Sequence, residues 1–223
     1  MIKKESKCEL PETYQNLKIN SLKQRLSKRE IWINGIIDDS LVETLYMNLI
    51  DMQESDTNKP ITIMINSNGG NLSESSVATD IIGTISNPVK TIALAKANSG
   101  GFMIFMAGKE RICHDFTELM MHNVACFMGY RKTNDINNYT KHLDSIMDKQ
   151  ASFFSRQTGG KTSKEYWLEL FKSDKDKWFS VEEAIELGIV HKVIKRPEAI
   201  NDGLLKRKPY MWNNDDLSRI MNY

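Results

Sequence analysis

The sequence predicts an α/β fold with a largely parallel sheet. Apolar, β-rich runs alternate with segments of helical periodicity through the first half of the 223-residue chain. The expected strands are residues 29–35, 61–66 and 89–95. The second and third read as continuous apolar runs, which is typical of strands buried on both faces. Strand–helix–strand units of this kind favour right-handed crossovers and parallel pairing.

Helix signals follow each strand. The capping box Ser40-Leu-Val-Glu43 opens a helix with one apolar face. The turn cluster at residues 67–71 leads into a helix that runs to about Ile85, and Asn87-Pro88 ends it. A third helix is expected after residues 98–101, where an apolar run resumes at helical length.

The second half predicts one more strand at residues 118–122 and a long helix at residues 133–157. Gly159-Gly160 supplies the stop signal for that helix. Thr162 and Ser180 are expected to cap two short helices, and residues 189–194 to form a last strand. We expect residues 1–20 to be a flexible N-terminal arm, residues 21–195 one domain, and residues 196–223 a C-terminal tail.

Composition narrows the classes of function. The formal net charge is only +1, which gives no electrostatic case for a nucleic-acid or membrane partner. The N-terminus lacks an apolar signal region, and three scattered cysteines indicate reduced thiols, so we expect a cytoplasmic location. The four histidines have no metal-ligand spacing, and no P-loop pattern is present. No cofactor is expected.

Ser99 stands at a sharp corner between an expected strand and an expected helix. A serine there is either an ordinary helix cap or a nucleophile held out of regular structure. Gly100 and Gly101 permit a tight backbone and close approach of a ligand. Free amides at the start of the following helix suit an oxyanion.

Other reactive side chains follow separate strands or loops. His122 ends one expected strand, and Asp174 and Asp176 lie in a loop before a capped helix. A serine, a histidine and an aspartate on separate loops are what acyl transfer requires, because the serine needs a base and the base needs an orienting acid. The chain order Ser, His, Asp differs from three common triad orders and so identifies no family by itself.

Four motifs together resemble the ClpP family of self-compartmentalised serine peptidases. They are Ile65-Asn-Ser-Asn-Gly-Gly70, Ala97-Asn-Ser-Gly-Gly-Phe102, Met120-Met-His122 and Asp176-Lys-Trp-Phe-Ser-x-x-Glu-Ala-x-x-x-Gly-Ile-Val190. The similarity covers roughly residues 20–195. It implies that Ser99 is the nucleophile, His122 the general base and Asp176 the orienting acid, and that the Gly70 and Gly100 amides form the oxyanion hole.

The resemblance also implies a fold and an assembly. The family fold is a crotonase-like spiral of ββα units with a protruding handle helix, which residues 133–157 would form. The family builds homo-oligomers of two stacked heptameric rings, fed with polypeptide substrates by an AAA+ ATPase unfoldase. Departures occur at Asn68 and Asn123-Val124, and at Gly100, where the family usually has methionine. The segment after His122 also lacks the family's glycine-rich strand.

Two other functions remain open from the sequence. The unusual Asn68 and Gly100 are compatible with a structural or regulatory ring subunit that keeps a degenerate site. The shared fold is also compatible with a crotonase-type enzyme that acts on acyl-CoA. Crotonases use carboxylates or paired amides without a serine–histidine pair, so the distance between Ser99 and His122 distinguishes this last class.

Overall fold

The structure is a computed structural model that describes residues 12–125, 132–173 and 175–195. Within these ranges seven strands form one sheet in the order β1-β2-β3-β4-β7, with β5 beside β3 and β6 beside β5. The strands are β1 (Glu30–Ile37), β2 (Ile61–Gly70), β3 (Val89–Asn98), β4 (Glu110–His114), β5 (Glu118–Met121), β6 (Lys177–Phe179) and β7 (Lys192–Ile194). The helices are α1 (Glu12–Ser27), α2 (Asp39–Ser55), α3 (Leu72–Thr84), α4 (Gly100–Ala107), α5 (Thr133–Gln157), α6 (Lys164–Lys172) and α7 (Val181–Glu186).

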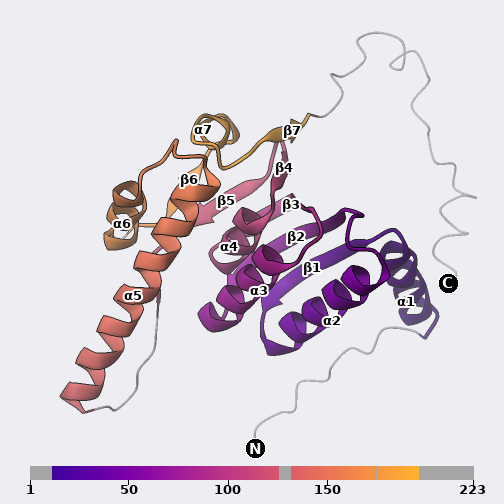
Figure 1. Ribbon diagram of the computed structural model, residues 1–223, viewed down its shortest axis with the longest axis horizontal. Helices are drawn as coiled ribbons and strands as arrows, with labels where there is room; N and C mark the ends of the chain where they lie inside the picture. The colour runs from indigo at the N-terminus through magenta and orange to yellow at the C-terminus, as the bar shows by residue number, and fades with distance from the viewer. Residues whose placement is uncertain (1–11, 126–131, 174, 196–223) are drawn as a thin grey trace, which may run out of the picture.

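The sheet has the predicted parallel character. The neighbours β1–β2, β2–β3, β3–β4, β3–β5 and β4–β7 all pair in parallel. Only the short pair β5–β6 is antiparallel among the described strands. Helices α2, α3 and α4 connect successive parallel strands and lie together beside the sheet (Figure 1). The α/β fold with a protruding helix is therefore confirmed.

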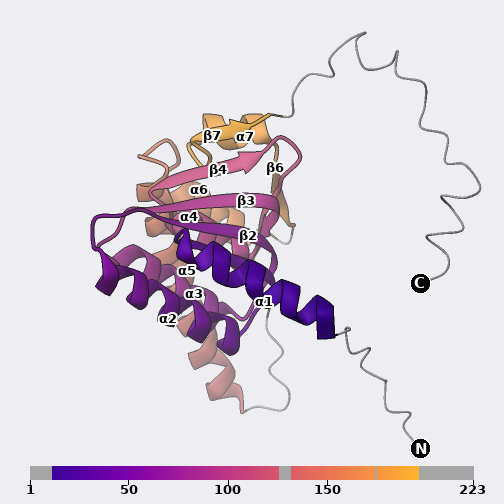
Figure 2. The ribbon, with the colours of Figure 1, turned by 90° about the vertical axis from the view of Figure 1, so that its right-hand side faces the viewer.

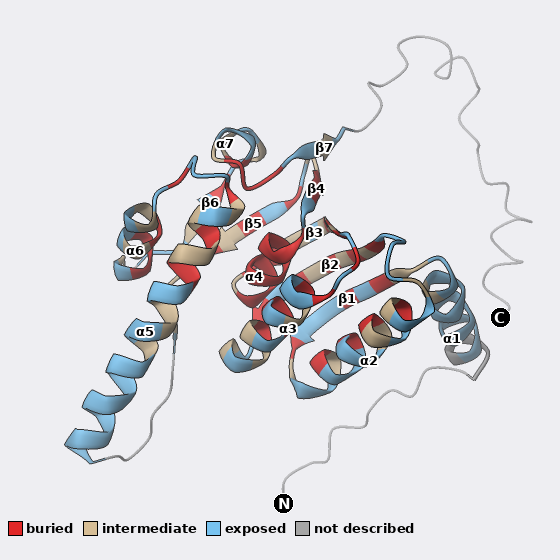
Figure 3. Ribbon diagram, viewed as in Figure 1, coloured by how far each residue is buried: buried red, intermediate tan, exposed pale blue. Residues whose placement is uncertain are grey.

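Helix α5 projects away from the body of the molecule, as both ribbon views show (Figures 1 and 2). Its bounds match the predicted 133–157. Its N-terminal half is almost entirely exposed, and its buried residues lie near its C-terminal end (Figure 3). These buried residues are Gln150, Ala151 and Phe154.

An aromatic cluster anchors the buried end of α5. Phe154 packs edge-on against Phe102 of α4 and Trp167 of α6, at ring-centroid distances of 5.6 and 4.9 Å. Phe102 also stacks on Phe179 of β6 at 5.5 Å. Aromatic pairs in these geometries contribute about 0.5–1.5 kcal/mol each beyond their buried area. The cluster thus holds three separate segments of the chain around α4.

The structure corrects three details of the sequence reading. The cap of α2 is Asp38, which accepts a hydrogen bond from the Leu41 amide, and not Ser40. The cap of α6 is Ser163 and not Thr162, whose hydroxyl accepts instead from the indole N–H of Trp167. Strand β6 was not predicted, because three residues give too short a run to reveal a period.

The structure describes part of the expected N-terminal arm and none of the expected C-terminal tail. Residues 12–20 belong to helix α1, so the expected N-terminal arm does not run to residue 20 as irregular chain. Residues 1–11 and the tail at 196–223 lie outside the described residues. In the part of the chain that is described, no helix is long and apolar enough to cross a bilayer.

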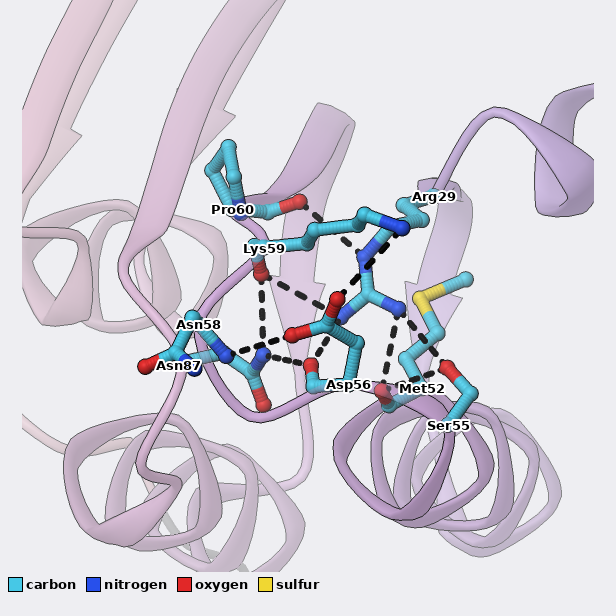
Figure 4. Close-up of polar contacts among 8 residues, drawn as sticks. All are labelled: Arg29, Met52, Ser55, Asp56, Asn58, Lys59, Pro60 and Asn87. Carbon is cyan, nitrogen blue, oxygen red and sulfur yellow. Dashed lines mark hydrogen bonds and ion pairs between the residues drawn. The ribbon is translucent and has the colours of Figure 1, made fainter.

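Arg29 fastens the start of β1 to the end of α2. It has a positive φ of 61°, and its guanidinium donates to the carbonyls of Met52, Asp56, Lys59 and Pro60 (Figure 4). The same group donates to the Ser55 hydroxyl. One side chain thus joins carbonyls at the end of α2 to carbonyls of the loop that leads to β2.

Candidate active site

Ser99 sits at the corner between β3 and α4 with strained backbone geometry. Its φ of 51° and ψ of −119° lie outside the regions that a residue with a Cβ atom ordinarily adopts. Such strain costs about 1–3 kcal/mol and concentrates at functional sites. Ser99 occupies the N-cap position of α4, but its side chain makes no capping hydrogen bond. The hydroxyl is therefore available for another partner.

That partner is His122. The Ser99 Oγ and the His122 Nε2 are 2.8 Å apart, which is hydrogen-bonding distance. His122 follows the last residue of β5, and β5 pairs in parallel with the end of β3. The Ser99 amide also donates to the Met120 carbonyl at 2.8 Å. The sheet itself thus brings together two residues that are 23 positions apart.

The two glycines at the end of β2 abut the Ser99 corner. Gly69 has a φ of +100°, and a Cβ atom there would lie 2.8 Å from the Gly100 nitrogen and from the Ser99 Cβ. A Cβ atom at Gly70 would overlap the Ile37 carbonyl oxygen. Both positions therefore require glycine. Gly70 and Gly100, the two candidate oxyanion donors, line the same pocket as Ser99 and His122.

The space around Gly100 explains one departure from the family pattern. A Cβ atom at Gly100 would overlap the hydroxyl of Ser75, which belongs to α3 and donates to the Asn71 carbonyl. A larger residue at position 100 would force the Ser75 hydroxyl to turn away from the Asn71 carbonyl. Glycine at position 100 thus fits the neighbouring serine on α3 without any such shift.

The pocket at Ser99 has a volume of about 530 Å³. Ser99, His122, Gly70 and Gly100 line it, and residues of α5 form another part of its wall. The residues of that wall recur every three or four positions, so they share one face of the helix. They are Tyr139, His142, Leu143, Ile146 and Gln150.

His142 is a residue whose place the sequence reading missed. It is exposed, but it also lines the pocket that contains Ser99. The helical spacing from Tyr139 to Gln150 was a signal for this wall. His191 lies elsewhere, where its Nδ1 accepts a hydrogen bond from the Arg111 amide.

Asp176 lies near the pair but does not contact it through a hydrogen bond. The antiparallel ladder pairs Met121 with Lys177, so its register places Asp176 opposite His122 one step beyond the last pair. Directly opposed residues have Cα atoms about 4.5–5.5 Å apart. The Asp176 side chain is exposed, and among the described residues no hydrogen bond joins its carboxylate to His122. Asp174, the competing aspartate, lies outside the described residues.

A family model and the similar curated proteins all indicate the same family. The Clp protease family model matches residues 14–197. A protein of Paracoccus denitrificans described as an ATP-dependent Clp protease proteolytic subunit is 29% identical over 173 residues, which cover 76% of this chain and 83% of that protein. A proteolytic subunit 2 of Thermobifida fusca (strain YX) is 26% identical over 180 residues, or 80% of this chain and 86% of the relative. A proteolytic subunit 3 of Rhodococcus jostii (strain RHA1) is 28% identical over 169 residues, or 75% and 81%.

Proposed function

The chain belongs to the Clp protease family, and from this premise we propose that it is a serine endopeptidase that cleaves unfolded polypeptides or peptides. The observation that carries the proposal is the 2.8 Å contact between the Ser99 Oγ and the His122 Nε2. A serine hydroxyl is a poor nucleophile until a base in this position accepts its proton. The shared pocket with Gly70 and Gly100 gives the reacting carbonyl a place next to backbone amides.

In the proposed reaction, His122 removes the Ser99 proton as the hydroxyl attacks the peptide carbonyl. The Gly70 and Gly100 amides donate to the oxyanion of the tetrahedral intermediate. Protonated His122 then gives its proton to the leaving amine, and water hydrolyses the acyl-enzyme by the same route in reverse. Asp176 orients the imidazole once its carboxylate turns toward His122, for which the β5–β6 register gives the opportunity.

The proposal extends to the assembly and its setting. We propose a cytoplasmic homo-oligomer of heptameric rings, stacked in pairs and served by an AAA+ ATPase unfoldase. Ile136 and Tyr139 are each 40% exposed on the projecting half of α5. A projecting helix with exposed apolar residues gains stability when another copy covers it. No metal or organic cofactor enters the proposed reaction.

A second candidate is a ring subunit with little or no catalytic activity. The exposed Asp176, without a hydrogen bond to His122, favours it, because an unsupported imidazole is a weaker base. A crotonase-type acyl-CoA enzyme is disfavoured by the serine–histidine contact, which that chemistry does not use.

Hydrolysis of a fluorogenic peptide by purified protein, with and without an unfoldase, tests the proposal. The Ser99→Ala variant should lose activity by about 10³-fold or more. The matched control is Ser145→Ala, an exposed serine on α5 outside the pocket, which should keep the full rate. Intact rings without hydrolysis in the wild-type protein would instead favour the inactive subunit.

A further inference from the structure

The catalytic pocket continues into a second pocket between α3 and α5. This second pocket has a volume of about 450 Å³, and four residues line both pockets. They are Ser73, Met103, Ile146 and Gln150. Met103 lies one turn after Ser99 in α4, where its amide donates to the Ser99 carbonyl. The junction of the two pockets therefore lies about one helical turn from Ser99.

Gln150 is, with Ser73, one of the two polar side chains at this junction, and most of its hydrogen-bonding capacity is not used. It is 7% exposed, and its Nε2 donates only to the Met103 sulfur at 3.5 Å. Sulfur is a weak acceptor. The buried Oε1 has no hydrogen-bond partner among the described residues. The oxygen is shielded from solvent in this position, so a ligand that donates a hydrogen bond meets it only after the carboxamide turns. Leaving such an oxygen unpaired is costly, so that contact is favourable.

The walls around Gln150 specify the rest of the ligand. Met103, Ile146, Phe153 and Phe154 supply apolar surface along the second pocket. A buried hydroxyl, Thr79 Oγ1, donates to the Ser75 carbonyl and keeps only acceptor capacity. The buried oxygens of Gln150 and Thr79 are therefore acceptors set among apolar side chains, which suits a ligand with an apolar body and a donor at its tip.

The charge at the rim of the second pocket disfavours a ligand with a cationic tip. Lys149 and Arg156 both line the second pocket and are exposed, against one carboxylate, Asp80. The excess of positive charge disfavours a lysine or arginine side chain. A carboxylate has no proton to give to the Gln150 Oε1. A neutral donor remains, and the phenol of tyrosine combines it with an aromatic body.

We propose that Gln150 makes this site select tyrosine over phenylalanine at the residue on the acyl side of the cleaved bond. The carboxamide turns about its last torsion, which has a broad energy profile, and its Oε1 accepts the phenol hydrogen. Phenylalanine fills the same space and leaves the oxygen unpaired. The inference rests on the proposed function for the bond that is cleaved, and on the pockets alone for the side chain that is bound.

The test uses two peptides that differ only by tyrosine or phenylalanine at this position. For the full-length wild-type protein, kcat/KM should favour tyrosine by about tenfold, as a hydrogen bond to a buried acceptor provides. In Gln150→Leu, which keeps the volume and removes the acceptor, the ratio should fall below about twofold. The matched control Asn138→Leu lies exposed on α5 outside both pockets and should keep the wild-type ratio.

A binding measurement separates this proposal from the proposed function. Fluorescence anisotropy with the Ser99→Ala protein, which cannot form an acyl-enzyme, should show the same preference in Kd. Tyrosine selectivity in binding without hydrolysis in the wild-type protein would support the pocket and refute the peptidase. Equal affinities of the Ser99→Ala protein for the two peptides would overturn the role of Gln150, and so would equal kcat/KM values for the wild-type protein. Neither outcome depends on whether Gln150→Leu folds.

Discussion

At the scale of single residues, Gly100 and Ser75 form a steric pair beside the nucleophile. The Ser75 hydroxyl occupies the volume that a Cβ atom at position 100 requires. Gly100→Ala should therefore destabilise the protein by about 1–3 kcal/mol, as overpacking does. In Gly100→Ala/Ser75→Gly the space is restored, and we expect a favourable coupling of about 1 kcal/mol or more relative to the sum of the single changes. Urea unfolding of the four proteins measures it, and simple additivity would contradict the steric pair.

The role of Asp176 is a second prediction at this scale. If its carboxylate orients His122 during the reaction, Asp176→Asn should lower kcat by about 10²–10⁴-fold with little change in stability. Asp174→Asn, two positions away, is the matched comparison and should remain within about twofold of the wild-type rate. The reverse ranking would transfer the orienting role to Asp174. Equal, full activity of both variants would remove the acid from the mechanism.

The candidate site was predictable from the sequence where local motifs carry it. The Ser99 corner and the glycines at the end of β2 are set by backbone requirements that leave a visible mark in the sequence, since only glycine fits at Gly69 and Gly70. The position of Asp176 depends on β6, whose three residues show no period. The unpaired oxygen of Gln150 depends on tertiary packing of α5 against α4, and no local pattern reports such a contact.

At the scale of elements, Arg111 of β4 connects segments that lie far apart in the sequence. Its side chain is 1% exposed and donates to the carbonyls of Gly108, Gln157, Gly188 and Ile189. Burial lowers the pKa of Arg111 to about 10, so it still carries its charge at neutral pH. Arg111 thus ties the end of α5 and the turn after α7 to the sheet.

Removal of this guanidinium should loosen both attachments. We expect Arg111→Met to cost about 3 kcal/mol or more of unfolding free energy, because several buried carbonyls lose their donor at once. Arg156→Met, an exposed arginine on α5, is the control and should change stability by less than about 0.5 kcal/mol. Chemical denaturation measures both. A small effect at Arg111 would mean that water replaces the guanidinium at little cost.

Helices were placed correctly from the sequence where apolar periodicity or a terminal glycine marks them. Their first residues were placed less accurately. Helix α5 was placed correctly because its apolar spacing is long and Gly159 and Gly160 end it with positive φ values. The start of α2 was misplaced because Asp38 and Ser40 are both good caps. Only the three-dimensional path of the chain decides between two such candidates.

At the scale of the whole molecule, α5 should serve in assembly as well as in the pocket. Ile136 lies on its projecting half and is 40% exposed. If another copy covers this region, Ile136→Lys should shift the protein to smaller particles. The control Asn138→Lys, at an exposed position two residues away, should leave the particle mass unchanged. Mass photometry of both variants reads the result, and unchanged rings in Ile136→Lys would exclude this residue from the contact.

The central claim is that the fold makes the Ser99 hydroxyl reactive by placing it against His122. Labelling with a fluorophosphonate probe, mapped by mass spectrometry of the digested protein, tests it most directly. The account predicts that the probe modifies Ser99, and that labelling falls by about 10²-fold or more in His122→Ala, which removes the base. Labelling at another residue, or at Ser99 with an equal rate in His122→Ala, would contradict it.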